Sequence, residues 1–396
     1  MSTGTARALQ HRVVGVDVAR CVALLGMMAT HVLYARDPDG TLSAAHWLAG
    51  GRASALFAVL AGVSLALVTG GVTPVRGVER VARSTGIVVR ALLVGALGLA
   101  LGALDSGLAI ILAYYAVLFV LALPFLGFRT PVLFALGAGW VVAAPVVSHL
   151  VRPLLPERGF ASPEFQQLSE PGRLLAELAF TGYYPAVPWV AYALVGLGVG
   201  RLNLRDRRIQ ACLIGLGAYL TVAATVLSRF LTERASVQAS LLAEPPYPGS
   251  FDELFDQIAE GTHGTTPTGG AWEWLLVVAP HSATPFDLAQ TIGSALLVIG
   301  CCLMFVDLLP QVGARAAALL FGAGTMTLTL YSLHVVMVSP LLPPVDEPET
   351  YRWHVLVVLA VGLVFVGLGK RGPLEACVGL AAGRASSGVR RVLRAD

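Results

Sequence analysis

The chain has 396 residues, of which 56% are hydrophobic and 13% charged, and its mean hydropathy is +0.74. Soluble domains carry about 25% charged residues, so this composition excludes an ordinary soluble protein. The net charge of +3 and five cysteines without CxxC spacing indicate no disulfide framework, no metal site and no nucleic-acid partner.

Ten segments are apolar over about 20 residues, the length that a membrane-spanning helix needs. In lipid every backbone polar group must pair internally, which favours helices. We therefore predict an all-α polytopic integral membrane protein with about ten transmembrane helices (10–11). The segments are 14–34, 48–69, 86–104, 107–126, 131–149, 181–200, 210–228, 286–306, 317–340 and 353–369.

Lys and Arg concentrate in alternate connecting segments, and Asp and Glu in the others. Since basic loops stay in the cytoplasm, we predict a multi-pass plasma-membrane protein with both termini cytoplasmic. One helical bundle is expected over 1–373, with long extracytoplasmic loops at 150–180 and 229–285 that either meet a substrate or cap the bundle. Residues 374–396, which contain Arg390, Arg391 and Arg394, are expected to form a cytoplasmic amphipathic helix and tail.

The first apolar segment carries Asp17, Arg20 and His31, and the start of the second carries His46 and Arg52. Intramembrane ionisable groups usually face a cavity or a partner. A histidine beside a buried arginine can serve as an acid or base next to an anion anchor. The alternative is structural: Asp17 and Arg20 pair to fix helix packing, and the two histidines are interfacial anchors.

Further along the chain, Arg90 could bind a phosphate, pair with Asp17 or extend its head group to the interface. The motif around Tyr184 and Trp189 contains two prolines, which predict a helix broken at one end. Both aromatic residues also suit an interfacial belt.

Two later segments carry the remaining candidates. Asp287 follows His281 and either orients it or complements the dipole of the helix that begins there. Thr327, Tyr331 and His334 share one helix face, so they form a polar stripe that either lines a site or bonds to neighbouring helices.

These motifs together resemble the bacterial DUF418/YeiB-like membrane proteins, which are related to heparan-α-glucosaminide N-acetyltransferase-like transmembrane acyltransferases. The motifs are VDVAR at 16–20, GRASALFAVLAGVS at 51–64, YPAVPW at 184–189, HSATPFD at 281–287, GTMTLTLYSLH at 324–334 and GPLE at 372–375.

The resemblance implies transfer of an acetyl group from cytoplasmic acetyl-CoA across the membrane to a sugar amine. It also implies a central histidine in the first outer loop, which His46 matches by order along the chain. The acetyltransferase branch has Asn-Gly after that histidine and an acid at the start of the next helix, where this chain has Trp47 and Arg52. His31 is the alternative.

We therefore expect a membrane-bound acyltransferase with acyl-CoA as co-substrate and no metal. In this hypothesis His46 or His31 is the base, Arg52 or His334 stabilises the oxyanion, and Arg20, Arg90 and Asp17 bind the donor. The substrate-side residues are Tyr184, Trp189, His281 and Asp287. The acceptor is an extracytoplasmic glycan or small metabolite.

Two other functions are compatible with the same residues. A transporter would use the polar groups to line a permeation path for a small polar or anionic solute, without chemistry. A scaffold would recruit partners through the long loops. Homodimerisation is open in all three.

Overall fold

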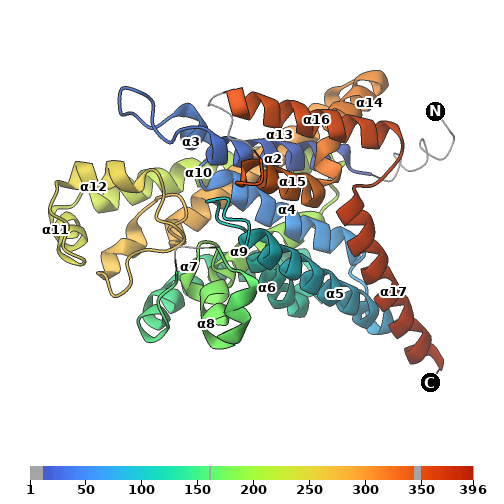
Figure 1. Ribbon diagram of the computed structural model, residues 1–396, viewed down its shortest axis with the longest axis horizontal. Helices are drawn as coiled ribbons and strands as arrows, with labels where there is room; N and C mark the ends of the chain where they lie inside the picture. Colours follow the sequence, from blue (N-terminus) through green and yellow to red (C-terminus); the bar gives the residue numbers. More distant parts are fainter. Residues whose placement is uncertain (1–11, 160–161, 343–348, 396) are drawn as a thin grey trace.

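The computed structural model describes residues 12–159, 162–342 and 349–395, which form a bundle of helices (Figure 1). Within these ranges the one β pairing is an isolated bridge between Arg36 and Leu42. The predicted all-α class is confirmed.

Seven helices of the described chain are long and apolar enough to cross a membrane. They are α2 (Val14–Val32), α3 with α4 (Ala44–Ala49, Arg52–Val68), α5 (Gly77–Gly102), α7 with a 3-10 turn (Thr130–Leu154), α10 (Arg207–Thr232), α13 (Pro285–Leu308) and α16 (Glu349–Gly367). Three shorter apolar helices are α6 with a 3-10 extension (Leu112–Gly127), α9 (Ala186–Gly200) and α15 (Thr327–Val338). The membrane class is confirmed, whereas ten spans and the orientation of the termini stay predictions.

The single helix predicted over 317–340 is wrong. This segment contains the end of α14 (Gln311–Leu320), a 3-10 turn (Gly322–Thr325) and then α15. Two glycines bring the turn against its neighbours: a Cβ at Gly322 would lie 2.8 Å from the carbonyl oxygen of Gly362, and one at Gly324 would overlap that of Asp17. The break therefore results from close backbone contact with α16 and α2, which hydropathy cannot register.

Helix α9 is the buried centre of the bundle and contacts α4, α6 and α7. Its approach to α4 requires glycine, because a Cβ at Gly196 would lie 2.9 Å from Gly62. Small residues let helix backbones pack closely in membranes. The helix begins at Ala186 rather than at 181, since a π turn (Glu177–Thr181) and Pro185 precede it.

Both predicted long loops are largely folded. The first contains short helical turns, namely η2 (Arg152–Leu154), η3 (Phe165–Ser169) and α8 (Pro171–Ala176). The second contains α11 (Ala235–Ala243), α12 (Phe251–Ile258) and η5 (Trp272–Leu276) around a small core of its own, with Leu241, Leu254 and Trp274 buried. We call the end of the bundle that carries these elements the loop end.

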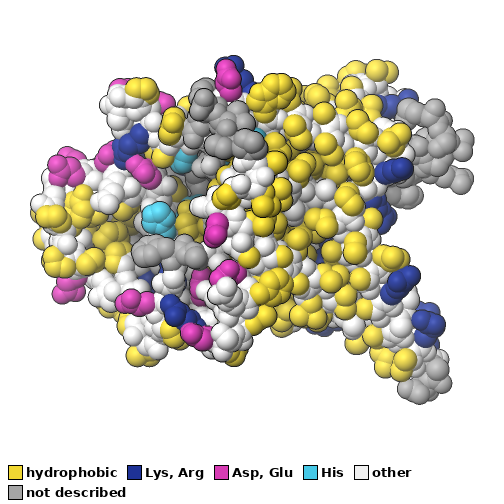
Figure 2. Space-filling model, in the orientation of Figure 1, with side chains coloured by type: hydrophobic (Ala, Val, Ile, Leu, Met, Phe, Trp, Pro, Cys, Tyr) yellow, Lys and Arg dark blue, Asp and Glu magenta, His cyan; other side chains and the backbone are white. Residues whose placement is uncertain are grey.

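Charge is distributed unevenly along the molecule. In Figure 2 acidic side chains gather over the loop end, the middle is mostly hydrophobic, and Lys and Arg are the charged side chains visible at the opposite end. At that opposite end, α17 (Pro373–Ala395) packs along α5 and joins it through a 2.7 Å bond from Arg390 Nε to Glu79 Oε2. The predicted C-terminal helix is present, and we call its end of the bundle the α17 end.

Candidate active site

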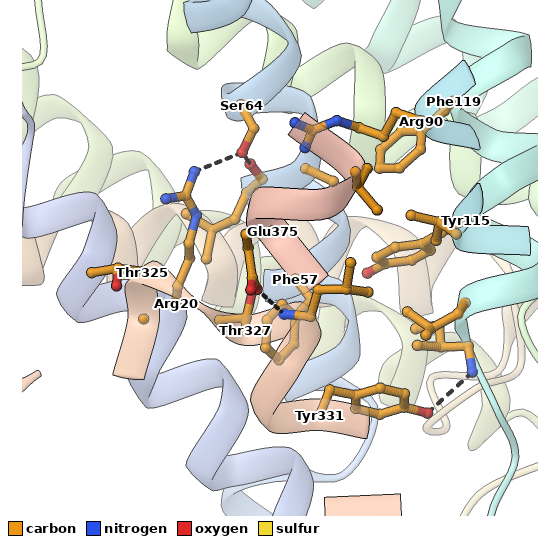
Figure 3. Close-up of a pocket in the computed structure, with 18 of the residues that line it drawn as sticks. Arg20, Phe57, Ser64, Arg90, Tyr115, Phe119, Thr325, Thr327, Tyr331 and Glu375 are labelled. Atoms are coloured by element: carbon orange, nitrogen blue, oxygen red, sulfur yellow. Dashed lines mark hydrogen bonds between the residues drawn. The ribbon is translucent and has the colours of Figure 1, made fainter. Parts of the chain in front are cut away.

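A cavity of about 340 Å³ lies between α2, α4, α5, α6, α15 and α17 (Figure 3). Pockets for small ligands usually measure about 300–1,000 Å³, so this one is at the lower end of that range. Its lining combines polar and aromatic side chains. The polar side chains include Arg20, Ser64, Arg90, Thr327 and Glu375, and the aromatic ones are Phe57, Tyr115, Phe119 and Tyr331.

Arg20 is held in the cavity wall by two hydrogen bonds. Its guanidinium donates to Asp17 Oδ1 at 2.9 Å and to Ser64 Oγ at 2.7 Å. Asp17 is buried and is paired on its other oxygen with Arg12 Nε at 2.7 Å. Asp17 therefore orients Arg20 and does not itself line the cavity.

Arg90 brings a second cation to the cavity, where it lies beside Phe119 and across from Arg20 (Figure 3). It lies within electrostatic range of Arg20 and Glu375. Its side chain lines the cavity, so a ligand inside the cavity can contact it. Two guanidinium groups around one space form an anion-binding arrangement, because guanidinium matches carboxylate and phosphate oxygens.

Glu375 caps the start of α15, although it belongs to α17. Its carboxylate accepts the backbone N–H of Leu328 at 2.7 Å and of Thr329 at 3.1 Å, and the Thr329 hydroxyl at 2.6 Å. The first N–H groups of a helix have no partner within it, and negative charge there also complements the helix dipole. This contact holds the start of α15 beside the cavity.

Replacing Glu375 with alanine is expected to lower the free energy of unfolding by about 1–2 kcal/mol, the usual cost of a lost N-terminal cap. The thermal unfolding midpoint in lipid nanodiscs measures this. Glu157, an exposed carboxylate in a loop, provides the matched control. Equal midpoints for Glu375→Ala and Glu157→Ala would mean that the cap contributes nothing.

Three histidines from three helices meet on the loop-end side of this cavity. His31 Nδ1 on α2 lies 3.1 Å from His334 Nε2 on α15. His334 Nδ1 lies 2.8 Å from His354 Nδ1 on α16. His334 and His354 are buried, and His31 is half-buried. The cluster lies next to the cavity along two helices. Met27 and Tyr331 line the cavity, and each lies about one helical turn before a histidine of the cluster, His31 or His334.

His46 lies on the short helix α3, close to this cluster. It contacts the Ser43 hydroxyl at 3.3 Å and is half-buried, within electrostatic range of His31 and Glu260. Arg52, at the start of α4, donates to the carbonyl oxygen of Trp47. Of the predicted pair, His46 is thus near His31, whereas the charge nearest to Arg52 is that of Asp287.

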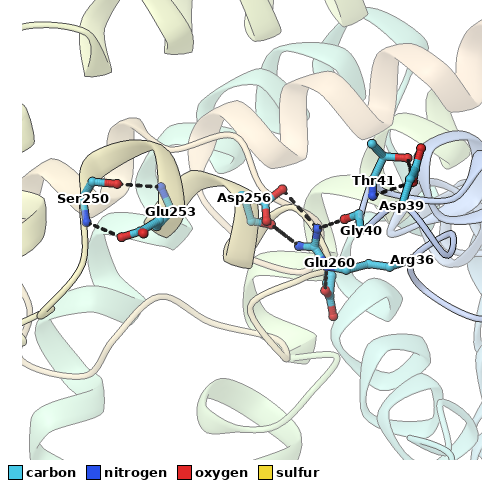
Figure 4. A network of polar contacts seen from close by, with 8 residues as sticks. All are labelled: Arg36, Asp39, Gly40, Thr41, Ser250, Glu253, Asp256 and Glu260. Carbon is cyan, nitrogen blue, oxygen red and sulfur yellow. Dashed lines mark hydrogen bonds and ion pairs between the residues drawn. The ribbon is translucent and has the colours of Figure 1, made fainter.

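An ion-pair network fastens the loop before His46 to α12 (Figure 4). Arg36 pairs with Asp256 at 2.9 Å and with Glu260, and it donates to the Gly40 carbonyl oxygen at 2.7 Å. Hydrogen bonds from Arg36 to Asp256 and Glu260 raise the pKa of Arg36 above its usual range. The loop-end elements therefore hold the segment that leads into α3.

Three of the four predicted substrate-side residues lie in one aromatic cluster. His281 lies with its ring 4.8 Å from Tyr183 and 5.5 Å from Tyr184, and Tyr184 is 5.2 Å from Trp189. His281 has a φ of +57°, a conformation that costs energy for a residue with a side chain.

Asp287 stabilises this strained turn. Its Oδ2 accepts the backbone N–H of Ala283 at 3.0 Å, and its own N–H bonds to the Thr284 hydroxyl. The hydrogen bonds of Asp287 thus go to Ala283 and Thr284 at the start of α13 rather than to the ring of His281. Arg52 lies within electrostatic range of Asp287, which connects this turn to the start of α4.

The sequence did not single out His354 or Glu375 as site residues. His354 stands at the beginning of the segment predicted as 353–369, and a histidine inside a membrane helix is itself a signal of function. Glu375 closes one of the motifs that carried the family resemblance. Its role appears only when α17 is placed against α15.

Two comparisons with known proteins bear on this geometry. The sequence model of one family, described as heparan-alpha-glucosaminide N-acetyltransferase, catalytic, matches residues 12–229. No curated protein matches the chain. The matched region contains Arg20, His31, His46, Ser64 and Arg90, whereas His334, His354 and Glu375 lie beyond it.

Proposed function

The chain belongs to the heparan-alpha-glucosaminide N-acetyltransferase catalytic family, and from this premise we propose that it is a membrane-bound acyltransferase. The donor is a coenzyme A thioester, and the acceptor is an amine or hydroxyl. One observation carries the proposal: a cavity with two arginines ends one helical turn from a cluster of imidazoles.

The donor enters from the α17 end, which we take as the cytoplasmic side. Arg20 and Arg90 bind its phosphate oxygens, and the Asp17 carboxylate keeps the Arg20 guanidinium in position. The pantetheine arm occupies the cavity past Phe57 and Tyr115, and its apolar walls suit that uncharged chain. The thioester then lies near Tyr331, one turn from His334.

The acceptor approaches from the loop end. His31 removes its proton as the acceptor nitrogen or oxygen bonds to the thioester carbonyl carbon, after which the C–S bond breaks. His46 contacts the acceptor from the opposite side, and Arg52 stabilises the oxyanion. Tyr184, Trp189 and His281 contact the body of the acceptor, and Asp287 stabilises the turn that carries His281. A cell-envelope glycan or a secreted metabolite fits this placement.

Donor binding is expected to weaken about 10- to 150-fold when Arg90 is replaced with alanine, because a hydrogen bond to a charged group contributes about 1.5–3 kcal/mol. Equilibrium binding of acetyl-CoA to protein in nanodiscs measures this. Exposed Arg315 on α14 supplies the control, since Arg315→Ala removes the same charge away from the cavity. A dissociation constant unchanged in Arg90→Ala would remove this arginine from the donor site.

The proposed function is tested directly by incubating the protein in nanodiscs with radiolabelled acetyl-CoA and a panel of amines and sugars. Transfer of label to an acceptor, with release of free thiol, is expected. If proteoliposomes instead move an anionic solute while consuming no acetyl-CoA, the protein is a transporter and the proposal is wrong.

A further inference from the structure

The three histidines form a continuous chain of imidazoles. The ring centroids of His31 and His334 are 5.3 Å apart with planes inclined by 9°, and those of His334 and His354 are 4.9 Å apart with planes inclined by 80°. The nitrogen–nitrogen distances are 3.1 Å for the first pair and 2.8 Å for the second. In each pair, the centroid separation is longer than this distance by roughly the summed radii of the two rings. The nitrogens therefore point at each other along the lines between ring centres, as N–H···N bonds require.

Proton counting restricts how this chain is arranged. A neutral imidazole has one N–H and one nitrogen lone pair. Both nitrogens of His334 are engaged, so it must donate to one neighbour and accept from the other. When His31 donates to His334 and His334 donates to His354, His31 Nε2 is left with a free lone pair. Reversing both bonds places a hydrogen on His31 Nε2 and frees His354 Nε2.

We propose that His31, His334 and His354 form a proton relay that carries the proton of the acceptor away from the reacting centre, an inference that rests on the proposed acyl transfer. His31 Nε2 takes the proton from the acceptor as its bond to the carbonyl carbon forms. The Nδ1 hydrogen of His31 passes to His334 Nε2, and that on His334 Nδ1 passes to His354 Nδ1. His354 Nε2 then releases its hydrogen to water.

The reverse sequence resets the relay. His354 Nε2 takes a proton from water, both bridging hydrogens move back, and His31 Nε2 gives its hydrogen to the departing thiolate. The acceptor loses one proton, the thiolate gains one, and no other reactant is needed. His354 is the sixth residue of α16, within two turns of its start, so the relay leads toward that helix end.

His334 and His354 are thus positioning residues that act through His31. His354 is not among the residues that line the cavity, and His334 stands between it and His31. Among the residues that the structure describes, the ionisable groups within electrostatic range of His31 are His46 from α3, His281 from the turn before α13, and His334 from α15. A change at His354 should alter proton transfer while leaving donor binding intact.

Two substitutions distinguish a relay role of His354 from a packing role. His354→Asn places an amide where Nδ1 stands, so it keeps a hydrogen bond to His334 but cannot pass a proton through. His354→Phe removes both. The relay predicts that both variants lose about 10- to 100-fold in kcat, below the roughly 10²–10⁴-fold that a general acid or base itself contributes, with an unchanged KM for acetyl-CoA. It also predicts a larger solvent deuterium isotope effect and a shifted pH profile in both. His149→Asn, a buried histidine packed against Trp272, is the matched control and should resemble the wild type.

Wild-type kcat in His354→Asn together with a loss in His354→Phe would show a packing role and overturn the relay, as would unchanged kcat in both. If the wild-type protein transfers no acyl group, the proposed function fails as a whole, and so does this relay as a step of it. Nitrogen-15 spectra of histidine-labelled wild-type protein in lipid provide a readout besides turnover. Correlations from His31 to His334 and from His334 to His354 support the chain, and their absence overturns it.

Discussion

Replacing His31 with alanine is expected to lower kcat for acyl transfer by about 10²–10⁴-fold, the usual contribution of a general base. His31 is the imidazole that joins the cavity to the histidine chain, since it follows cavity residue Met27 by one turn and bonds to His334 at 3.1 Å. Arg20 and Arg90 are untouched by the change, so the dissociation constant for acetyl-CoA should stay within twofold or so. Turnover measured alongside equilibrium donor binding checks both parts.

Two comparison variants sharpen this result. His149→Ala removes a buried histidine outside the candidate site and should retain wild-type turnover. His46→Ala tests the residue that matches the family histidine by its order along the chain. Should His46→Ala abolish turnover while His31→Ala leaves it unchanged, the base is His46 and our assignment of His31 is wrong.

Replacing Gly324 with alanine is expected to destabilise the protein by about 1–3 kcal/mol or more, the usual range for overpacking. The added Cβ would overlap the carbonyl oxygen of Asp17 and approach the backbone nitrogen of Cys21 to 3.0 Å. Both are backbone atoms within α2, so no flexible side chain can move aside. Because Gly324 and Thr325 also line the cavity, acetyl-CoA binding should weaken as α2 and the turn separate.

Gly139 on α7 gives the matched control. A Cβ there would meet nothing within 4 Å, and alanine in a helix interior is favoured over glycine by about 1 kcal/mol. Gly139→Ala should therefore unfold at the same temperature as the wild type or above it. Thermal unfolding in nanodiscs compares the two. A midpoint for Gly324→Ala as high as that of Gly139→Ala would show that the turn can move away from α2 at little cost.

The sequence by itself determined the class of the protein and the place of most helices. Hydrophobic length is a local property, because each membrane helix satisfies its own backbone in lipid whatever its neighbours do. Segments such as 14–34 and 286–306 therefore correspond closely to α2 and α13. The family relationship could also be recognised from short motifs. Two of these motifs, around Arg20 and Ser64, supply neighbouring side chains of the cavity.

Only the tertiary structure decided which polar groups meet. His31 and His334 are 303 residues apart along the chain, and Glu375 caps a helix that begins 48 residues before it. Their pairing depends on how α2, α15, α16 and α17 pack. Hydropathy over 317–340 likewise could not reveal the break before α15, because the cause is contact of Gly322 and Gly324 with other helices. A buried polar group needs a partner, but the identity of that partner follows from packing between distant segments rather than from the local sequence.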